Sequence, residues 1–227
     1  MLPKVIIYNI VSLDGRIDGF NADTELYYQQ TSKWDVDAVL MGSNSVLTLF
    51  NAKSREHREE GIFKVQDVDE NDTRPLLVVP DSGGKIRIWS EVFKLSFIKD
   101  ILVLCSRSTP QEYLDFLEER DIKYMIIGYD KVKLGTALEE LNTQFSVKSI
   151  RVDSGGALNG ALLMDDLVDE ICLLVHPTMV GGISTNTIYT VPDLTSTNEI
   201  LDLKLLKMEK LKNEIIMLHY RVMKYNF

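Results

Sequence analysis

The stretch "ILVLCSRSTPQEYLDFLEERDIKYMIIG" (101–128) decides the fold class, because it places two apolar runs on either side of a polar segment. The runs 101–106 and 123–128 are short and apolar, as buried strands are. We predict a helix over the intervening residues 111–120. Two strands joined through a helix pair in parallel, with a right-handed crossover. The stretch therefore predicts an α/β fold.

Two helix-start signals support this prediction. Thr109, Pro110 and Glu112 have the order of an N-cap, a proline at the first helical position and a capping-box partner. Thr136 and Glu139 repeat the N-cap and its partner before a second predicted helix. A further strand at 149–153 completes an alternation of strands and helices.

The remaining apolar runs extend this pattern over the whole chain. Further strands are predicted at 4–10, 38–42, 74–79 and 168–177, and an antiparallel hairpin at 203–211 and 215–225. The sequence therefore predicts one α/β domain over 1–227, with a mostly parallel central sheet and an antiparallel C-terminal edge. Residues 51–73 are polar and acid-rich, and we expect them to form a surface excursion.

Composition excludes several classes of function. The formal net charge of −9 argues against a nucleic-acid-binding protein. Cys105 and Cys172 lie in apolar runs and are expected in the core, and the three histidines are too far apart in sequence to indicate a metal site. No apolar run reaches membrane-spanning length, and the N-terminus lacks the pattern of a signal peptide. We therefore expect a cytoplasmic protein without a metal.

Serine and glycine follow nearly every predicted strand. In an open α/β sheet, ligands bind beyond the carboxyl ends of the strands, and backbone N–H groups and small hydroxyls suit phosphate oxygens. The segments are "SLDGR" (12–16), "GSNS" (42–45), "PDSGG" (80–84), "SRST" (106–109) and "SGGA" (154–157).

Two of these segments open predicted helices, at Gly42–Ser45 and at Gly155–Ala157. Each is either a tight turn or an anion site, and together they could hold a pyrophosphate from two sides. Neither matches the glycine pattern of a Rossmann fold or a P-loop. The residues alone therefore leave the turn and the anion site open, and they offer no standard dinucleotide motif.

Several of these segments, together with one longer string, carry a resemblance to a known family. The segments "SLDGRI", "DAVLMGSNSV", "RPLLVV" and "ILVLCS", and above all "VDSGGALNGALLMDDLVDEICLLVHPTMVGG" (152–182), resemble the reductase domain of riboflavin biosynthesis. This family comprises the C-terminal half of bacterial RibD and stand-alone enzymes, and it shares the dihydrofolate-reductase fold. The resemblance covers about residues 4–223 and implies a homodimeric, NADPH-dependent reductase. The implied substrate is a ribosylamino-pyrimidine 5′-phosphate, whose ribose is opened to a ribityl chain.

The resemblance also implies roles for individual residues. On the substrate side it implies Ser12, Asp14, Arg16 and Asp153, with Val11 and Ser12 beside the nicotinamide. For the pyrophosphate it implies two groups, which are Gly42, Ser43 and Ser45, and Ser154, Gly155, Gly156, Ala157 and Leu158. For the adenosine 2′-phosphate it implies Ser106 and Arg107, since Arg is a good bidentate phosphate donor.

The chain also departs from the family pattern. Asp153 stands where the family often has Glu, so it either caps the following helix or faces the substrate. An Asp-x-Pro segment found in many relatives is replaced by "LTLFNAKSREH" (47–57). Two alternatives therefore stay open, which are a dihydrofolate or pterin-type reductase on the same fold and a non-catalytic nucleotide-binding protein.

Overall fold

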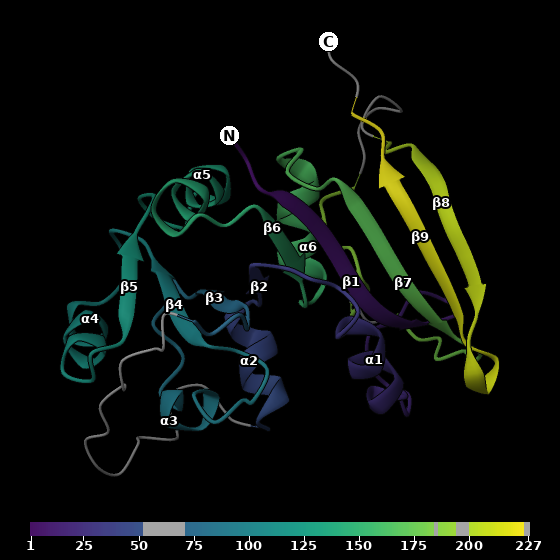
Figure 1. Cartoon of the computed structure of the whole chain (residues 1–227), viewed down its shortest axis with the longest axis horizontal. Helices are drawn as coiled ribbons and strands as arrows, with labels where there is room; N and C mark the ends of the chain where they lie inside the picture. Colours follow the sequence, from purple (N-terminus) through teal and green to yellow (C-terminus); the bar gives the residue numbers. More distant parts are fainter. Residues whose placement is uncertain (52–70, 184–185, 194–199, 225–227) are drawn as a thin grey trace. The chain divides into compact units, whose positions relative to one another are not determined.

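The computed structural model describes residues 1–51, 71–183, 186–193 and 200–224 (Figure 1). Over these residues the strands are β1 (Lys4–Ser12), β2 (Ala38–Leu40), β3 (Leu76–Pro80), β4 (Asp100–Cys105), β5 (Lys123–Ile126), β6 (Ser149–Val152), β7 (Glu170–His176), β8 (Leu203–Lys210) and β9 (Ile216–Val222). The α-helices are α1 (Thr24–Thr31), α2 (Ser43–Leu49), α3 (Trp89–Val92), α4 (Gln111–Glu118), α5 (Leu134–Phe145) and α6 (Gly156–Met164).

The strands of the described residues form one sheet in the order β5-β4-β3-β2-β6-β1-β7-β9-β8. The pairs β2–β3, β3–β4, β4–β5 and β1–β7 are parallel, and β9 pairs antiparallel with both β7 and β8. The predicted fold class is therefore confirmed, a mostly parallel sheet with antiparallel C-terminal strands. The C-terminal hairpin is confirmed as well.

The chain divides into two compact units. The first contains Met1–Pro3 and Val36–Ile150, and the second contains Lys4–Asp35 and Arg151–Phe227. The prediction that 1–227 form a single domain stays a prediction.

The core of the first unit lies around β3 and β4. These strands are buried along nearly their whole length, as parallel strands covered on both faces are. The largest fully buried side chains next to them are Trp89 and Tyr113, and the Trp89 indole N–H donates to the Tyr113 hydroxyl (3.2 Å). Cys105, at the end of β4, is a buried free thiol, as predicted.

The second unit packs different partners on the two faces of β1. Tyr8 is fully buried against Leu26 of α1 and against Cys172 and Leu174 of β7. Because successive strand residues point to opposite faces, Asn9 points away from this cluster, and its side chain contacts Asn159 of α6. Cys172 is buried and free, as predicted.

The predicted capping box before α4 is wrong. Pro110 has extended backbone angles and is itself the N-cap, and no side chain caps this helix. The Thr109 hydroxyl instead accepts from the Ser106 N–H (2.9 Å) and donates to the Ser82 carbonyl (2.9 Å). The Thr109 hydroxyl, which the local pattern assigned to the start of the helix, therefore bonds to other parts of the chain instead.

The predicted start of α5 is also wrong. The helix begins at Leu134, so Thr136 lies inside its first turn, and no side chain caps it. Leu134 is buried, and the Ala137 N–H already donates to the Lys133 carbonyl (2.9 Å). Burial of Leu134 extends the helix beyond the local signal.

Most of the predicted surface excursion, 52–70 within 51–73, lies outside the described residues. Within the described part of the chain, no helix is both long enough and apolar enough to cross a membrane.

Thr109 gives a test of the first unit. We expect Thr109→Val to lower the free energy of unfolding by about 1–3 kcal/mol, because it leaves the buried Ser106 N–H without an acceptor. Glu112→Gln, the matched change at the supposed capping-box partner, should change it by less than about 0.5 kcal/mol. Urea unfolding of both variants measures the two values, and equal losses would contradict this assignment.

Candidate functional site

The turn after β1 is closed by the Ser12 side chain. Ser12 is buried, and its hydroxyl donates to Asp14 Oδ1 (2.6 Å). The Ser12 Oγ also accepts a hydrogen bond from the backbone N–H of Arg16 (2.9 Å). Gly15 adopts φ +76°, a left-handed conformation that glycine tolerates without strain. Val11, the preceding residue, is buried on the face of β1 that also carries Asn9. The turn therefore presents a fixed arrangement of polar groups.

Asp14 and Arg16 join this turn to the segment that follows β7. Asp14 accepts from the N–H groups of Val180 (3.1 Å) and Gly181 (2.7 Å). The hydrogen bond from Ser12, followed by those from the two backbone groups, holds the pKa of Asp14 well below its usual value of 3.8. The Arg16 guanidinium donates to the Gly182 carbonyl (2.6 Å) and lies 3.9 Å from the Asp14 carboxylate. Both charged groups are thus engaged within the chain.

The "SGG" turn leads into α6 as predicted. Ser154 is buried, and Gly155 is the N-cap with extended backbone angles and no side-chain cap. Ala157 is exposed and Leu158 is half-buried in the first turn of the helix. The N–H groups of a first helical turn and the helix dipole favour an anion at this end. Both features are compatible with phosphate binding.

Gly156 has a packing role that the sequence did not reveal. A Cβ atom there would lie 2.3 Å from the Thr187 carbonyl and 2.4 Å from the Thr190 hydroxyl, and at Gly160 it would lie 2.3 Å from the Thr190 carbonyl. The Thr190 N–H also donates to the Gly156 carbonyl (3.1 Å). The segment around 187–190 therefore packs directly on α6, which accounts for both glycines without a ligand.

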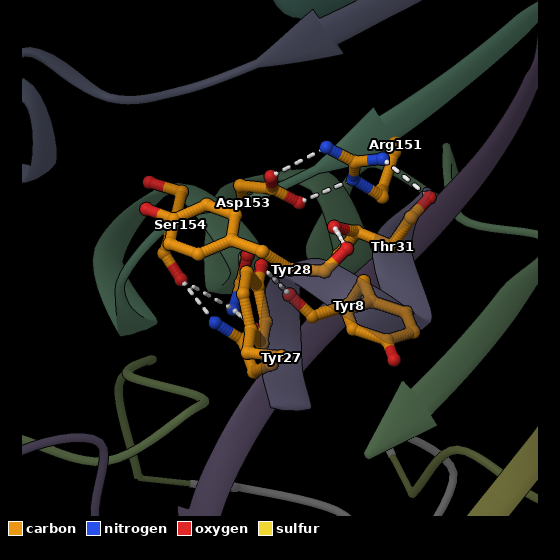
Figure 2. Close-up of polar contacts among 9 residues, drawn as sticks. Tyr8, Tyr27, Tyr28, Thr31, Arg151, Asp153 and Ser154 are labelled. Atoms are coloured by element: carbon orange, nitrogen blue, oxygen red, sulfur yellow. Dashed lines mark hydrogen bonds and ion pairs between the residues drawn. The ribbon is translucent and has the colours of Figure 1, made fainter. Parts of the chain in front are cut away.

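Asp153 forms a buried ion pair with Arg151 (Figure 2). The guanidinium donates to both carboxylate oxygens, at 2.9 and 3.0 Å, and also to the Thr31 carbonyl at the end of α1 (3.2 Å). Each side chain is 8% exposed. Because no side chain caps α6, Asp153 is not the helix cap that one alternative assumed.

Two tyrosines of α1, Tyr27 and Tyr28, lie on the Asp153 side of this pair (Figure 2). The Tyr27 hydroxyl donates to the Tyr8 carbonyl (3.2 Å). Burial raises the pKa of Tyr27 well above 10, and the negative charge of Asp153 adds to the shift. Burial, and then the same charge, also raises the pKa of the partly exposed Tyr28. The Asp153 carboxylate is therefore held by Arg151 beside neutral phenols.

In the first unit, the predicted segment "GSNS" opens α2. Gly42 is the N-cap, and Ser43 and Ser45 lie half-buried in the first turn. Lys85, the residue directly after the segment "PDSGG", reaches the same helix, because its ammonium donates to Asn44 Oδ1 (3.1 Å). A cation and small hydroxyls therefore meet at the start of α2.

The residues predicted for the 2′-phosphate differ in exposure. Ser106 is fully buried, and its hydroxyl contacts the Ser108 hydroxyl (3.0 Å) and the Asp130 carbonyl (3.3 Å). Arg107 is exposed, and its N–H donates to the Gly128 carbonyl (3.2 Å). Arg107 therefore remains the better candidate for a phosphate ligand, whereas the Ser106 hydroxyl serves the turn.

Sequence reasoning missed Arg151, Asn9 and Asn159. Asn9 is a polar residue within the apolar run of β1, and Asn159 lies inside the family-like string. A polar residue that interrupts a buried strand is the one available signal, because such a group needs a partner. The joint action of the "GSNS" and "SGG" turns stays a prediction, since they belong to different units. Within the described residues, no three His, Cys, Asp or Glu side chains are grouped to hold a metal ion.

Asp14 should make stability depend on pH. Its pKa is lowered in the folded state, so the ionised carboxylate contributes stability above an unfolded pKa of about 3.9, and this is lost as pH falls through the lower folded value. We expect Asp14→Asn to lower Tm at neutral pH and the gap to wild type to shrink below about pH 4. Thermal scans at several pH values measure the difference in Tm between Asp14→Asn and wild type. The substitution Asp130→Asn at an exposed residue is the control. A gap independent of pH would refute the role of the charge.

The Arg151–Asp153 pair gives a second test. Arg151→Leu should lower the free energy of unfolding by about 3–5 kcal/mol, because it leaves a buried carboxylate without its cation. The double variant Arg151→Leu/Asp153→Leu should recover most of that loss. Chemical denaturation of both proteins and of Asp153→Leu completes the cycle. If the double variant is no more stable than Arg151→Leu, the pair is not the source of the loss.

Comparisons with known proteins agree with the fold and the sequence pattern. A 2,5-diamino-6-ribosylamino-4(3H)-pyrimidinone 5′-phosphate reductase of Archaeoglobus fulgidus is 27% identical over 205 residues, covering 83% of this chain and 86% of the relative. A protein of the same name from Methanothermobacter thermautotrophicus is 25% identical, covering 95% and 97% of the two chains.

Solved structures show the same fold. A pyrimidine reductase-like protein of Corynebacterium diphtheriae superposes with a TM-score of 0.75 at 16% identity, covering 98% of this chain and 93% of that one. The riboflavin biosynthesis reductase of Saccharomyces cerevisiae gives 0.65 at 20% identity, covering 98% and 90%. The RibD C-terminal domain family matches residues 3–217. The chain therefore belongs to the RibD C-terminal domain family, the pyrimidine reductase family of riboflavin biosynthesis.

Proposed function

We propose that this chain is an NADPH-dependent reductase that converts the ribosylamino group of a pyrimidine 5′-phosphate to a ribitylamino group. The observation that carries the proposal is family membership together with the "SGG" turn, which opens α6 in a chain of that family. The names of the relatives support the substrate class, at 24–27% identity.

The polar groups at the strand ends fit the proposed cofactor. Phosphate oxygens need N–H donors and cations, and the turns offer backbone N–H groups, small hydroxyls and the exposed Arg107. In this proposal the pyrophosphate is held by Gly42, Ser43 and Ser45 and by Ser154, Gly155, Gly156, Ala157 and Leu158, and Val11 lies beside the nicotinamide. The Arg107 side chain takes the 2′-phosphate, and the backbone around the buried Ser106 shapes that turn.

When bound, the cofactor supplies a hydride to C1′ of the ribosylamino group. The bond between C1′ and the ring oxygen breaks, and a proton goes to that oxygen, which leaves a ribityl chain. Ser12, Asp14, Arg16 and Asp153 form the substrate side of the proposal. Because Asp14 and Arg16 are already held by neighbouring backbone groups, they can place the substrate without first having to be ordered.

Two further expectations remain proposals. The family resemblance supports a homodimer, and the exposed apolar residues Leu205 and Met208 on β8 offer it a surface. Light scattering measures that state. The cytoplasmic location stays a prediction.

The function is tested by turnover. Purified protein should oxidise NADPH in the presence of the ribosylamino-pyrimidine phosphate, measured by the loss of absorbance of the reduced nicotinamide. Turnover of dihydrofolate with none of the pyrimidine would favour the pterin alternative. Binding of NADPH without turnover of either would favour a nucleotide-binding protein, and binding of neither NADPH nor NADH would overturn the proposal.

Arg107 tests the choice of cofactor. We expect Arg107→Ala to raise the Kd for NADPH about 10- to 100-fold, because it removes a charge-assisted contact to the 2′-phosphate, and to leave the Kd for NADH within about two-fold. Arg107→Lys keeps the charge but not the bidentate geometry, so it should fall between wild type and the alanine variant. Fluorescence titration measures the Kd of each ligand for wild type and for both variants. Equal effects on NADPH and NADH would rule out a 2′-phosphate contact.

A further inference from the structure

We propose that Asn9 and Asn159 are positioning residues that fix the orientation of the Ser154–Gly155 peptide, and through it the turn that leads into α6. The inference rests on the proposed function, because it takes this turn to bind the pyrophosphate of NADPH. Neither asparagine belongs to the residues that the family resemblance implied. Both act, in this proposal, through the backbone and not by touching the cofactor.

The two side chains hold one carbonyl from two directions. Asn9 Nδ2 donates to the Ser154 carbonyl at 2.8 Å, and Asn159 Nδ2 reaches the same oxygen at 3.3 Å. Asn159 Nδ2 also donates to Asn9 Oδ1 (3.0 Å), which joins the two amides to each other. Its third acceptor is the Ile188 carbonyl (2.9 Å). One buried amide thus connects β1, the "SGG" turn and the segment that packs on α6.

The contacts also fix which atom of each amide is nitrogen. The Asn159 amide group faces two backbone carbonyls, of Ser154 and Ile188, and a carbonyl can only accept. Asn9 Nδ2 likewise faces the Ser154 carbonyl, so Asn9 Oδ1 is left to accept from Asn159. The network is therefore directional, with both amides donating towards Ser154.

The buried Asn159 side chain lowers the stability of the fold. It is 0% exposed, and its Oδ1 has no hydrogen-bond partner among the described residues. A buried polar atom without a partner costs about 1–3 kcal/mol. A leucine at position 159 would avoid this cost. The gain from asparagine there is therefore its donor Nδ2. The donor serves the backbone of the turn and its neighbours, which is the property expected of a positioning residue.

Holding the Ser154 carbonyl fixes the next N–H as well. A trans peptide is planar, and its C=O and N–H point in opposite directions. With the carbonyl directed towards Asn9 and Asn159, the Gly155 N–H points to the opposite side of the peptide plane. Glycine at 155 has the widest choice of backbone angles, so without an external hold this peptide could rotate. The two asparagines remove that freedom at the residue where α6 begins.

The test compares the binding of NADPH with the binding of 2′-AMP. Asn9→Leu removes the donor to Ser154 from a half-buried position, and 2′-AMP carries the 2′-phosphate but no pyrophosphate. We expect Asn9→Leu to raise the Kd for NADPH about ten-fold or more and to leave the Kd for 2′-AMP within about two-fold. In parallel, the Gly155 and Gly156 amide resonances should shift in the free variant relative to wild type.

Asn142→Leu is the matched control. Asn142 Nδ2 also donates to a backbone carbonyl, that of Val147 (2.9 Å), but in the first unit. The control should lose stability and keep both affinities. Asn9→Asp retains the acceptor and loses the donor. It should therefore raise the Kd for NADPH, as Asn9→Leu does.

Each outcome decides the matter. A folded Asn9→Leu protein that binds NADPH within about two-fold of wild type overturns the positioning role and leaves the proposed function standing. Parallel loss of NADPH and 2′-AMP affinity also overturns it, because that is the signature of general destabilisation. Wild-type protein that binds neither NADPH nor NADH overturns the proposed function, and the positioning role with it.

Discussion

The turns that leave the parallel strands draw backbone N–H and C=O groups out of water, and the structure depends on side chains that satisfy them. A buried backbone group without a partner costs as much as a lost hydrogen bond. Asp81 accepts the N–H groups of Lys85 and of the buried Ile86, and Thr109 accepts that of the buried Ser106. Nearer the surface, Asp14 accepts two N–H groups in the same way. The small polar residues at the strand ends are therefore needed for folding before any ligand is considered.

This requirement changes how the candidate site is understood. A serine or an aspartate at a strand end was predicted to face a ligand, yet the hydroxyls of Ser12 and Ser106 are both engaged within their own turns. What such a turn can still offer a ligand is its backbone, whose orientation the side chains determine. Arg107 is different, because its side chain is exposed while its N–H anchors the turn. The proposed phosphate contacts thus divide between oriented backbone groups and the exposed side chain of Arg107.

The sequence predicted the positions of strands and helices, which depend on local patterns. It did not predict the hydrogen bonds between residues that are far apart in the chain. Strand positions, the C-terminal hairpin and the starts of α2 and α6 follow from apolar runs and glycines, and all were confirmed. The helix α4 begins at Gln111 as predicted, but its N-cap was wrongly predicted because the Thr109 hydroxyl bonds to the Ser82 carbonyl, 27 residues away. The asparagine pair, Asn9 with Asn159, spans 150 residues. No pattern in a single sequence shows such a partner, so the candidate residues were predictable while their hydrogen bonds were not.

The distribution of charge connects the fold to the proposed ligands. The chain carries a net charge of −9, and the proposed cofactor and substrate both carry phosphates. A carboxylate open to the site would repel them. Asp153 is neutralised by Arg151 in a buried pair, and the Asp14 carboxylate is occupied by two N–H groups and a hydroxyl. The acids that the strand ends need for their turns are thereby paired within the chain. Within the second unit, the positive potential at the start of α6 then acts on an anion without opposition from these two carboxylates.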